Sequence, residues 1–518
     1  MRPTPWHPPV ELSEAERTIV KQIRRAKLFV WLRDHRHELF DQQFQSELAR
    51  AYPEGSLGQP PVAPGQLALA TILQAYSGCS DDEAIERTLM DRRWQLVLDC
   101  LDTRYPPFSK GTLVSFRQRL IENDLDRRLV ERTVDLAERT RGFGSRQLRA
   151  ALDSSPLWGA GRVEDTINLL GHALRKAVGL LARQQGWGLA ELAAHAGVEE
   201  LGDSSMKAAL DQNWEEPGAR DHALGVILGT LEKVESLVGA QPHADPEAVV
   251  MVAAAQQVRD QDVISDAEGG PTIRQGVAKD RRISIEDPQM RHGRKTRSLR
   301  VDGYKRHVLT DLDSKLVRAV GITPANAPEA TVTEQIAADL AEQAAELREL
   351  HIDRAYLSSQ MVQERGSELE VICKAFPVRN GARFTKTEFQ LDWDRREIRC
   401  PNDVVLPFIP GGPVNFPQAV CDSCPLRQRC TSSKHGRSVQ IHPDEQLLTE
   451  LRARQQTPHG RARLRERVAV EHTLAHIGHW QGRRARYRGQ RKNLFDLRRS
   501  ATIHNLHVIA RPPQKVAA

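Results

Sequence analysis

The sequence predicts a mixed α/β protein whose central sheet is covered by helices. Three observations predict this fold class. Five short apolar segments read as strands, and segments with helical spacing lie between them. The first 145 residues show helical spacing without a strand signal. Residues 381–440 change to a period of two and carry a group of cysteines, which indicates a small β-rich insertion.

Length and composition are those of an ordinary folded protein. A chain of 518 residues exceeds a single hydrophobic core, so several domains are expected. Hydrophobic residues make up 40% and charged residues 27%, which excludes a disordered chain. No apolar run approaches the roughly 18 to 20 residues of a membrane span, and the N-terminus lacks the apolar region of a secretory signal. We therefore expect a cytoplasmic protein without a membrane partner.

The N-terminal part is predicted to be helical. Residues 13–16 and 80–83 each have the form of a helix start. Residues 58–65 are rich in Pro and Gly and are predicted to form a loop. Such a helical domain either presents a recognition helix to DNA or serves dimerisation and packing. The sequence leaves both alternatives open.

The first strand is predicted at residues 147–156. Pro156 has no N–H for pairing and is expected to end it. Residues 163–270 then form a largely helical insertion of about a hundred residues.

Four more strands follow the insertion. Residues 304–311 and 315–322 are predicted to form a hairpin. A helix over about 331–350 leads into a short buried strand at 350–352, and residues 370–375 form the fifth strand. The expected division is a helical domain over 1–145, an α/β core with its helical insertion over 146–380, the β-rich insertion over 381–440 and a C-terminal helical part of the core over 441–518.

The β-rich insertion contains a candidate metal site. The cysteines are Cys400, Cys421, Cys424 and Cys430. In a reducing cytoplasm disulfides are not expected, and a Cys-x2-Cys pair suits one side of a structural Zn²⁺ site. Since the other two cysteines do not form such a pair, reduced buried thiols and a relic that binds no metal remain alternatives.

Three carboxylates form the candidate active site. Asp153 and Asp353 each follow a predicted strand, where open α/β sheets usually place their ligands. Glu471 lies on a predicted helix over 461–477, on the face expected to be buried, where an ion pair with Arg467 would add only about 0.2 to 0.5 kcal/mol. Dispersed carboxylates are what two-metal phosphoryl transfer requires. The alternative is that the aspartates are caps or turn formers.

The net charge of +6 is concentrated in two stretches. Such clusters are the footprint of a nucleic-acid backbone, and the alternative is a solvated surface of ion pairs. The clusters are Arg291, Arg294, Lys295, Arg297, Arg300, Lys305 and Arg306, and Arg483, Arg484, Arg486, Arg488, Arg491, Lys492, Arg498 and Arg499.

Several blocks of the sequence occur in an order typical of one known family. The blocks are Gly58-Gln59-Pro60-Pro61, Ser80-Asp81-Asp82-Glu83-Ala84, Trp94, Phe116-Arg117, Leu152-Asp153-Ser154-Ser155-Pro156, Glu164-Asp165-Thr166, Arg291-His292-Gly293-Arg294-Lys295, Gly303-Tyr304-Lys305, His351-Ile352-Asp353-Arg354-Ala355-Tyr356, Arg467-Val468-Ala469-Val470-Glu471 and Arg486-Tyr487-Arg488-Gly489. Together they resemble the DDE transposases of bacterial insertion sequences, of the cut-and-paste kind.

The resemblance implies a ribonuclease-H-like (retroviral-integrase-like) core. Asp153, Asp353 and Glu471 would bind two Mg²⁺ ions, with Mn²⁺ as an alternative. Water would then hydrolyse a phosphodiester at the ends of the element, and the freed 3′-OH would attack target DNA. The implied partner is double-stranded DNA, bound by a homodimer associated with the nucleoid. The cations expected at the DNA are Arg467, Arg483, Arg484, Arg486, Arg488, Lys295 and Lys305.

The sequence departs from the family pattern near Glu471. Many members carry Tyr and Lys where this chain has Leu464 and Gly478. The phosphate-contacting role of that Lys is expected to pass to Arg483, Arg484 or Arg486. Related enzymes also use an aromatic residue of the β-rich insertion to hold a flipped base; Trp393 is the candidate, although alternating aromatics usually pack in the strand core.

Two rival functions remain. One is a catalytically inactive DNA-binding protein descended from a transposase, and the other is a nuclease without strand transfer. The transposase hypothesis requires the three carboxylates to converge in space.

Overall fold

The computed structural model describes residues 2–54, 60–142, 145–203, 205–210, 212–267 and 269–511. Gly58 and Gln59 of the predicted loop lie outside the described residues. Among the helices of the described ranges, none has both the length and the apolar character needed to cross a membrane.

The N-terminal part is helical, as predicted. Side chains of Ser13 and Ser80 cap the first turns of α1 and α5 in capping boxes, which confirms both predicted helix starts. Its helices are α1 (Glu14–Gln22), α2 (Lys27–Leu39), α3 (Gln42–Ala49), α4 (Pro64–Ser77), α5 (Asp81–Met90), α6 (Arg92–Leu98), α7 (Lys110–Glu122) and α8 (Leu125–Arg141).

The central sheet has six strands, β1 (Gln147–Trp158), β4 (Arg291–Arg294), β5 (Arg300–Asp311), β6 (Val317–Pro324), β7 (Glu346–Ile352) and β8 (Glu370–Cys373). Their order is β4-β5-β1-β7-β8, and β6 also pairs with β5. Strand β1 is antiparallel to β5 and parallel to β7, and β7 is parallel to β8. The sheet is therefore mixed, and the antiparallel β5–β6 pair confirms the predicted hairpin.

Two boundaries differ from the sequence prediction. Strand β1 does not end at Pro156 but continues to Trp158. Pairing with β7 ends at Ala151, so Pro156 has a neighbouring strand only on the β5 side, and a missing N–H is tolerated at such an edge. The helix predicted over 331–350 is also shorter, because α14 (Thr333–Glu342) ends before β7 pairs with β1.

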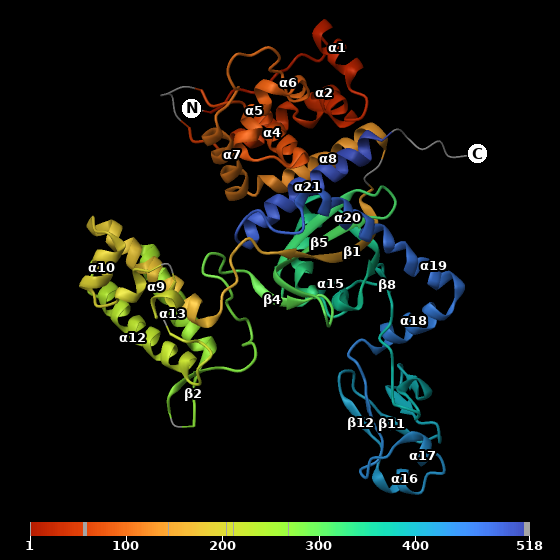
Figure 1. Cartoon of the computed structure of the whole chain (residues 1–518). Coiled ribbons are helices and arrows are strands. Elements are labelled where there is room, and N and C mark those ends of the chain that lie inside the picture. The colour runs from red at the N-terminus through yellow and green to blue at the C-terminus, as the bar shows by residue number, and fades with distance from the viewer. Residues whose placement is uncertain are drawn as a thin grey trace.

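Helices cover both faces of the sheet. One hydrophobic cluster joins β1 and β7 to α14 and α18 (Glu445–Gln456). The other joins β5 and β6 to α20 (Val468–Gln481) and α21 (Gln490–Ala510). Helix α21 lies between the sheet and the N-terminal helices (Figure 1), since its residues Phe495 and Ile503 belong to the N-terminal hydrophobic core.

Two further units lie beside the sheet in Figure 1. The helical insertion contains α9 (Thr166–Gln185), α10 (Leu189–His195), α11 (Met206–Ala209), α12 (Ala219–Gly239), α13 (Pro246–Asp262) and the short strands β2 (Val263–Ser265) and β3 (Pro271–Ile273). The β-rich insertion contains β9 (Gln390–Asp392), β10 (Glu397–Arg399), β11 (Val405–Pro407), β12 (Pro413–Asn415), β13 (Ser438–Gln440), α16 (Gln418–Asp422) and α17 (Arg427–Cys430). The β9–β10 hairpin turns at residues 393–396, between the paired residues Asp392 and Glu397.

Helices α18, α19 (Pro458–Glu466) and α20 lead from the β-rich insertion back to the sheet (Figure 1). The single helix predicted over 461–477 is thus divided at Arg467, which lies at the junction of α19 and α20.

Candidate active site

Asp153 and Asp353 lie at corresponding positions of neighbouring parallel strands. The last pair of the β1–β7 register is Ala151 with His351, and each aspartate is two residues further along its chain. The side chain of Asp153 is only 10% exposed, whereas Asp353 is exposed. The sheet therefore brings the two predicted aspartates to one edge, as strand ends in an α/β sheet do.

Arg467 joins Asp153 to Glu471. Its Nη1 donates to Asp153 Oδ2 at 2.5 Å, and its Nη2 donates to Glu471 Oε1 at 3.0 Å. Asp153 and Glu471 also line one groove of about 520 Å³ between β1 and α20. Asp353 does not belong to the lining of that groove. Two of the three predicted carboxylates thus share a cation and a groove, and the third lies on the adjacent strand.

The burial predicted for Glu471 is wrong. Its side chain is 50% exposed, and Val468 on the same face is exposed as well. The buried face of α20 consists of Val470, Thr473, Leu474, Ile477, Trp480 and Gln481. The prediction failed because the residues of α20 that pack against the sheet lie on another face of this helix.

Electrostatics set Asp153 apart from an ordinary surface carboxylate. Burial raises the pKa of Asp153 above its usual value, and the nearby cations Arg467 and Lys295 act against this rise. Lys295 approaches through the neighbouring residue, since its Nζ donates to Ser154 Oγ at 2.9 Å. The carboxylate is therefore partly desolvated and held by cations, as expected of a group that binds positive charge.

The three carboxylates have the oxygen atoms that suit a hard cation, but their positions in the structure do not form a metal site. All three side chains offer oxygen, which Mg²⁺ prefers, and Mg²⁺ keeps several waters with one or two carboxylates. The Arg467 guanidinium is a cation already placed between two of these carboxylates. Within the described ranges, however, no group of three or more His, Cys, Asp or Glu side chains is arranged to hold a metal ion.

Two family models match the chain. A Transposase DDE domain matches residues 412–510, and a Transposase domain (DUF772) matches residues 16–119. Both matches indicate an insertion-sequence DDE transposase. The first match includes Arg467 and Glu471, but neither match reaches Asp153 or Asp353. No curated protein and no solved structure matches the transposase.

The predicted DNA-contacting cations of the transposase divide into two groups. Arg483 lines the groove, with its guanidinium 5.5 Å from the centre of the Trp158 ring, and Arg467 and Lys295 adjoin Asp153. The remaining four make contacts outside the groove. Arg484 donates to Gly159 O, and Arg486 donates to Trp480 O. Arg488 pairs with Glu286, and Lys305 donates to Ala327 O.

The transposase groove contains one cation that the sequence did not single out. Arg306 on β5 pairs with Ser155 across the sheet and lines the groove together with Asp153 and Glu471. In the sequence it was only one member of a basic cluster. Its position depends on the β1–β5 register, which no local signal specifies.

The cysteines of the transposase are all free thiols. Cys400, Cys421 and Cys430 pack beside the core of the β-rich insertion. Burial raises the pKa of the Cys430 thiol, Arg437 lowers it, and the other three cysteines raise it again. Since the described residues contain no three-ligand group suited to a metal, the Zn²⁺ prediction for Cys400, Cys421, Cys424 and Cys430 is not supported.

Trp393 packs in the β-rich insertion. Its ring makes a T-shaped contact with Phe408 at 5.2 Å, and it adjoins that insertion's hydrophobic core. This contact favours the strand-core interpretation over a base-holding role.

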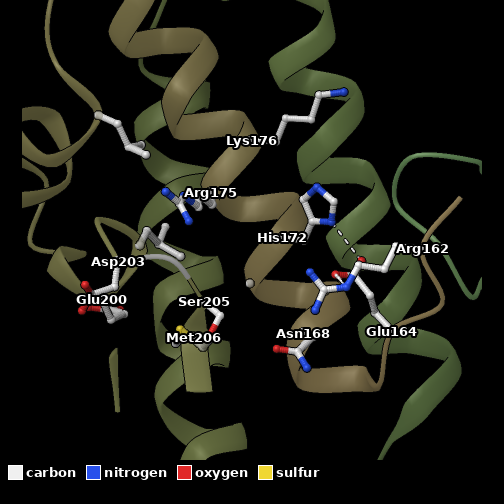
Figure 2. A pocket seen from close by; sticks show the side chains of 13 residues that line it. Arg162, Glu164, Asn168, His172, Arg175, Lys176, Glu200, Asp203, Ser205 and Met206 are labelled. Atoms are coloured by element: carbon white, nitrogen blue, oxygen red, sulfur yellow. Dashed lines mark hydrogen bonds and ion pairs between the residues drawn. The ribbon is translucent and has the colours of Figure 1, made fainter. Parts of the chain in front are cut away.

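A separate cavity of about 380 Å³ lies in the helical insertion of the transposase (Figure 2). Its charged side chains pair with one another or with their surroundings, as His172 does with Glu164 at 2.9 Å and Lys176 with Glu247 at 2.7 Å. Since none of the predicted site residues lines it, this cavity is not part of the candidate active site.

Proposed function

We propose that this chain cleaves DNA at the ends of an insertion sequence and joins the freed 3′ ends to target DNA. The observation that carries the proposal is the guanidinium of Arg467, which joins Asp153 of the central strand to Glu471 of a distant helix. Because one guanidinium contacts both carboxylates, their oxygens face a common point, as the ligands of a metal-dependent phosphoryl-transfer site must.

We also propose that the sheet is a ribonuclease-H-like core, with domain limits at about residues 145, 380 and 440. Support comes from a mixed sheet in which β1, the strand that carries Asp153, lies between antiparallel β5 and parallel β7. In this proposal the N-terminal helices and the β-rich insertion contact the DNA, and a homodimer assembles on it in the cytoplasm at the nucleoid.

In the proposed reaction Asp153, Asp353 and Glu471 would hold two Mg²⁺ ions, or Mn²⁺ in their place. Bound there, the ions would activate the attacking oxygen and stabilise the leaving one. The protein's own groups have separate tasks. Arg467 balances the charge of Asp153 and Glu471 and would contact the phosphate of the DNA. Lys295 fixes the chain beside Asp153 through Ser154, and Arg483 binds the DNA backbone at the rim of the groove.

The test uses a DNA fragment that carries the genomic flanks of the reading frame. The full-length protein is expected to nick this fragment with Mg²⁺ and to join the cleaved ends to a plasmid, and Asp353→Asn is expected to abolish both. Glu232→Gln, at an exposed position of α12 in the helical insertion, is the control. Nicking without joining would leave a nuclease, and binding without nicking would leave an inactive DNA-binding protein.

A further inference from the structure

Arg306 is a buried cation that opens onto the groove of the candidate active site. The residue is 5% exposed, and it lines the groove with Asp153, Glu471 and Arg483. Strand β5 holds its backbone opposite Ser155, two residues beyond Asp153. The sheet therefore fixes Arg306 beside the carboxylates.

Neutral groups alone hold the Arg306 guanidinium in place. Its Nε donates to Ser155 Oγ at 2.7 Å, and its Nη1 donates to Gln481 Oε1 at 3.0 Å and to Gly482 O at 2.9 Å. Among the residues that the structure describes, no carboxylate forms an ion pair with it. Burial lowers the pKa of Arg306 to about 10, and the carboxylate of Asp496, which forms its ion pair with Arg499, offsets only part of this unfavourable desolvation.

A buried charge without a counter-charge is unfavourable, so its retention calls for a compensating role. The comparison with Arg498 is direct, because that equally buried arginine pairs with Asp124, Asp126 and Asp339. The hydrogen bonds of Arg306 orient its planar fork toward the groove without neutralising it. A fixed, uncompensated guanidinium is suited to binding an anion, and phosphate in particular.

The facing helix packs closely on one side of the guanidinium, so an anion has to reach Arg306 from the groove. Gly478 of α20 faces the guanidinium, and a Cβ at this position would lie 3.1 Å from Arg306 Nη2. Any larger side chain at this position would therefore push the guanidinium out of its place. Glu471 is seven residues earlier on the same helix, about 10 Å along its axis. DNA rises about 3.4 Å per nucleotide along one strand, so this separation is up to about three nucleotide steps.

We propose that Arg306, with Arg483 beside it, binds a phosphate of the DNA strand a few nucleotides from the phosphate that is cleaved. Arg306 is then a positioning residue, since it holds the strand and does not touch the reacting atoms. The inference rests on the proposed function for the identity of the ligand as DNA. The anion site itself stands on the groove and on the uncompensated charge.

The first experiment measures the anion site with inorganic phosphate as the probe. The melting temperature of the full-length protein is followed in phosphate and in chloride of equal ionic strength. Wild type is expected to be stabilised by phosphate, and Arg306→Gln is expected to lose that gain. Gly478→Leu is a second variant, which keeps the charge of Arg306 in the protein but displaces its guanidinium from the groove.

The matched control is Arg318→Gln. Arg318 on β6 is 2% exposed and forms no ion pair among the described residues, as is true of Arg306. It donates instead to Gln343 Oε1 and Ser145 O, and it does not line the groove. The control therefore loses a buried guanidinium without losing the proposed anion site, and is expected to keep the phosphate response.

The second experiment measures binding of a short duplex DNA against salt concentration. Loss of one phosphate contact lowers the slope of log affinity against log salt by about 0.9, which is about a three- to fourfold change between 50 and 200 mM salt. We expect this decrease in Arg306→Gln and Gly478→Leu but not in Arg318→Gln. If phosphate stabilises the wild type but the salt slope is unchanged in Arg306→Gln and Gly478→Leu, the groove binds free phosphate alone. That result would overturn the assignment to DNA.

The two proposals fail in different ways. If both groove variants keep the wild-type phosphate response and salt slope while Asp353→Asn abolishes nicking, the inference about Arg306 is wrong and the transposase function stands. Suppose instead that the wild-type protein does not nick DNA. If both groove variants then lose the phosphate stabilisation and show the decreased salt slope, the function is wrong and the anion site stands.

Discussion

Two regions of the molecule use their arginines differently. At the interface of α8 and α21, Arg491 and Arg498 meet the buried Asp126, and Arg498 also reaches Asp339. In the groove between β1 and α20, Arg306 has no such partner in the described part of the chain, and Arg467 holds the two carboxylates of the candidate site.

The difference separates structural arginines from functional ones. A cation that is fully paired inside the protein stabilises the fold and has little capacity left for a ligand. A cation that lacks a partner, or whose partners are themselves candidate ligands of a metal, is available for binding. Substitutions in the interface should therefore change stability, and substitutions in the groove should change activity and binding.

The largest effect is expected from Asp153→Asn in the groove. We expect the rate of Mg²⁺-dependent nicking to fall by at least about a thousandfold, since loss of roughly 4 kcal/mol of transition-state stabilisation corresponds to that factor. Initial rates of nicking measure it, with Glu232→Gln as the exposed control. If Asp153→Asn retained a tenth of the wild-type rate, Asp153 would not be part of the active site.

In the interface, Arg498→Met is expected to lower the free energy of unfolding by about 3 to 5 kcal/mol, because it removes the ion pair of the buried Asp339 and leaves the buried Asp126 with Arg491 as its counter-charge. Urea unfolding measures this change. Arg488→Met is the control, since its pair with Glu286 is exposed and should contribute less than about 1 kcal/mol. Equal losses in the two variants would contradict the distinction between the regions.

Arg467→Gln tests the cation that bridges the two carboxylates. Because Mg²⁺ has to displace the guanidinium from Asp153 and Glu471, the variant is expected to bind Mg²⁺ about three- to tenfold more tightly, a difference on the order of 1 kcal/mol. Isothermal titration of full-length protein measures the affinity. Arg463→Gln on α19, which pairs with Glu349 and Glu370, is the control. Weaker binding in Arg467→Gln would mean that the guanidinium supports the site and does not compete.

A more gradual effect concerns pH and the interface helix α21. The pKa of His504 is lowered to about 4, mainly by burial and less by its neighbours His476, Arg511 and His507, while the hydrogen bond to Lys315 O opposes this shift. The unfolded chain takes up this proton near pH 6.5, so stability is full above pH 6.5 and falls as pH decreases toward 4. The slope for one such histidine is at most about 1.4 kcal/mol per pH unit.

His504→Gln is expected to flatten this dependence when the free energy of unfolding is measured between pH 4.5 and pH 7. His459→Gln, at an exposed position of α19, is the control. An unchanged slope in His504→Gln would show that the acid sensitivity has another origin.

The sequence was informative where local chemistry decides the structure. Capping boxes at Ser13 and Ser80 and the hairpin of β5 and β6 follow from residues close together in the chain, and the structure confirms them. Asp153 and Asp353 were candidates because each follows an apolar strand, and the β1–β7 register places them at corresponding positions.

Long-range pairing decided what the sequence did not reveal. The continuation of β1 through Pro156 depends on which edge of the strand is free. The roles of Arg306 and Arg498 depend on whether distant carboxylates meet them, and both arginines belong to basic stretches that look alike in the sequence. The exposure of Glu471 depends on which face of α20 packs against the sheet.

The most direct test of the account is Mn²⁺ binding, followed by electron paramagnetic resonance in the full-length protein and in Asp153→Asn, Asp353→Asn and Glu471→Gln. If the three side chains form one site, each substitution lowers Mn²⁺ affinity by at least about tenfold, or roughly 1.4 kcal/mol, while Asp394→Asn leaves it unchanged. Wild-type affinity in any one of the three variants would contradict a shared site and with it the proposed chemistry.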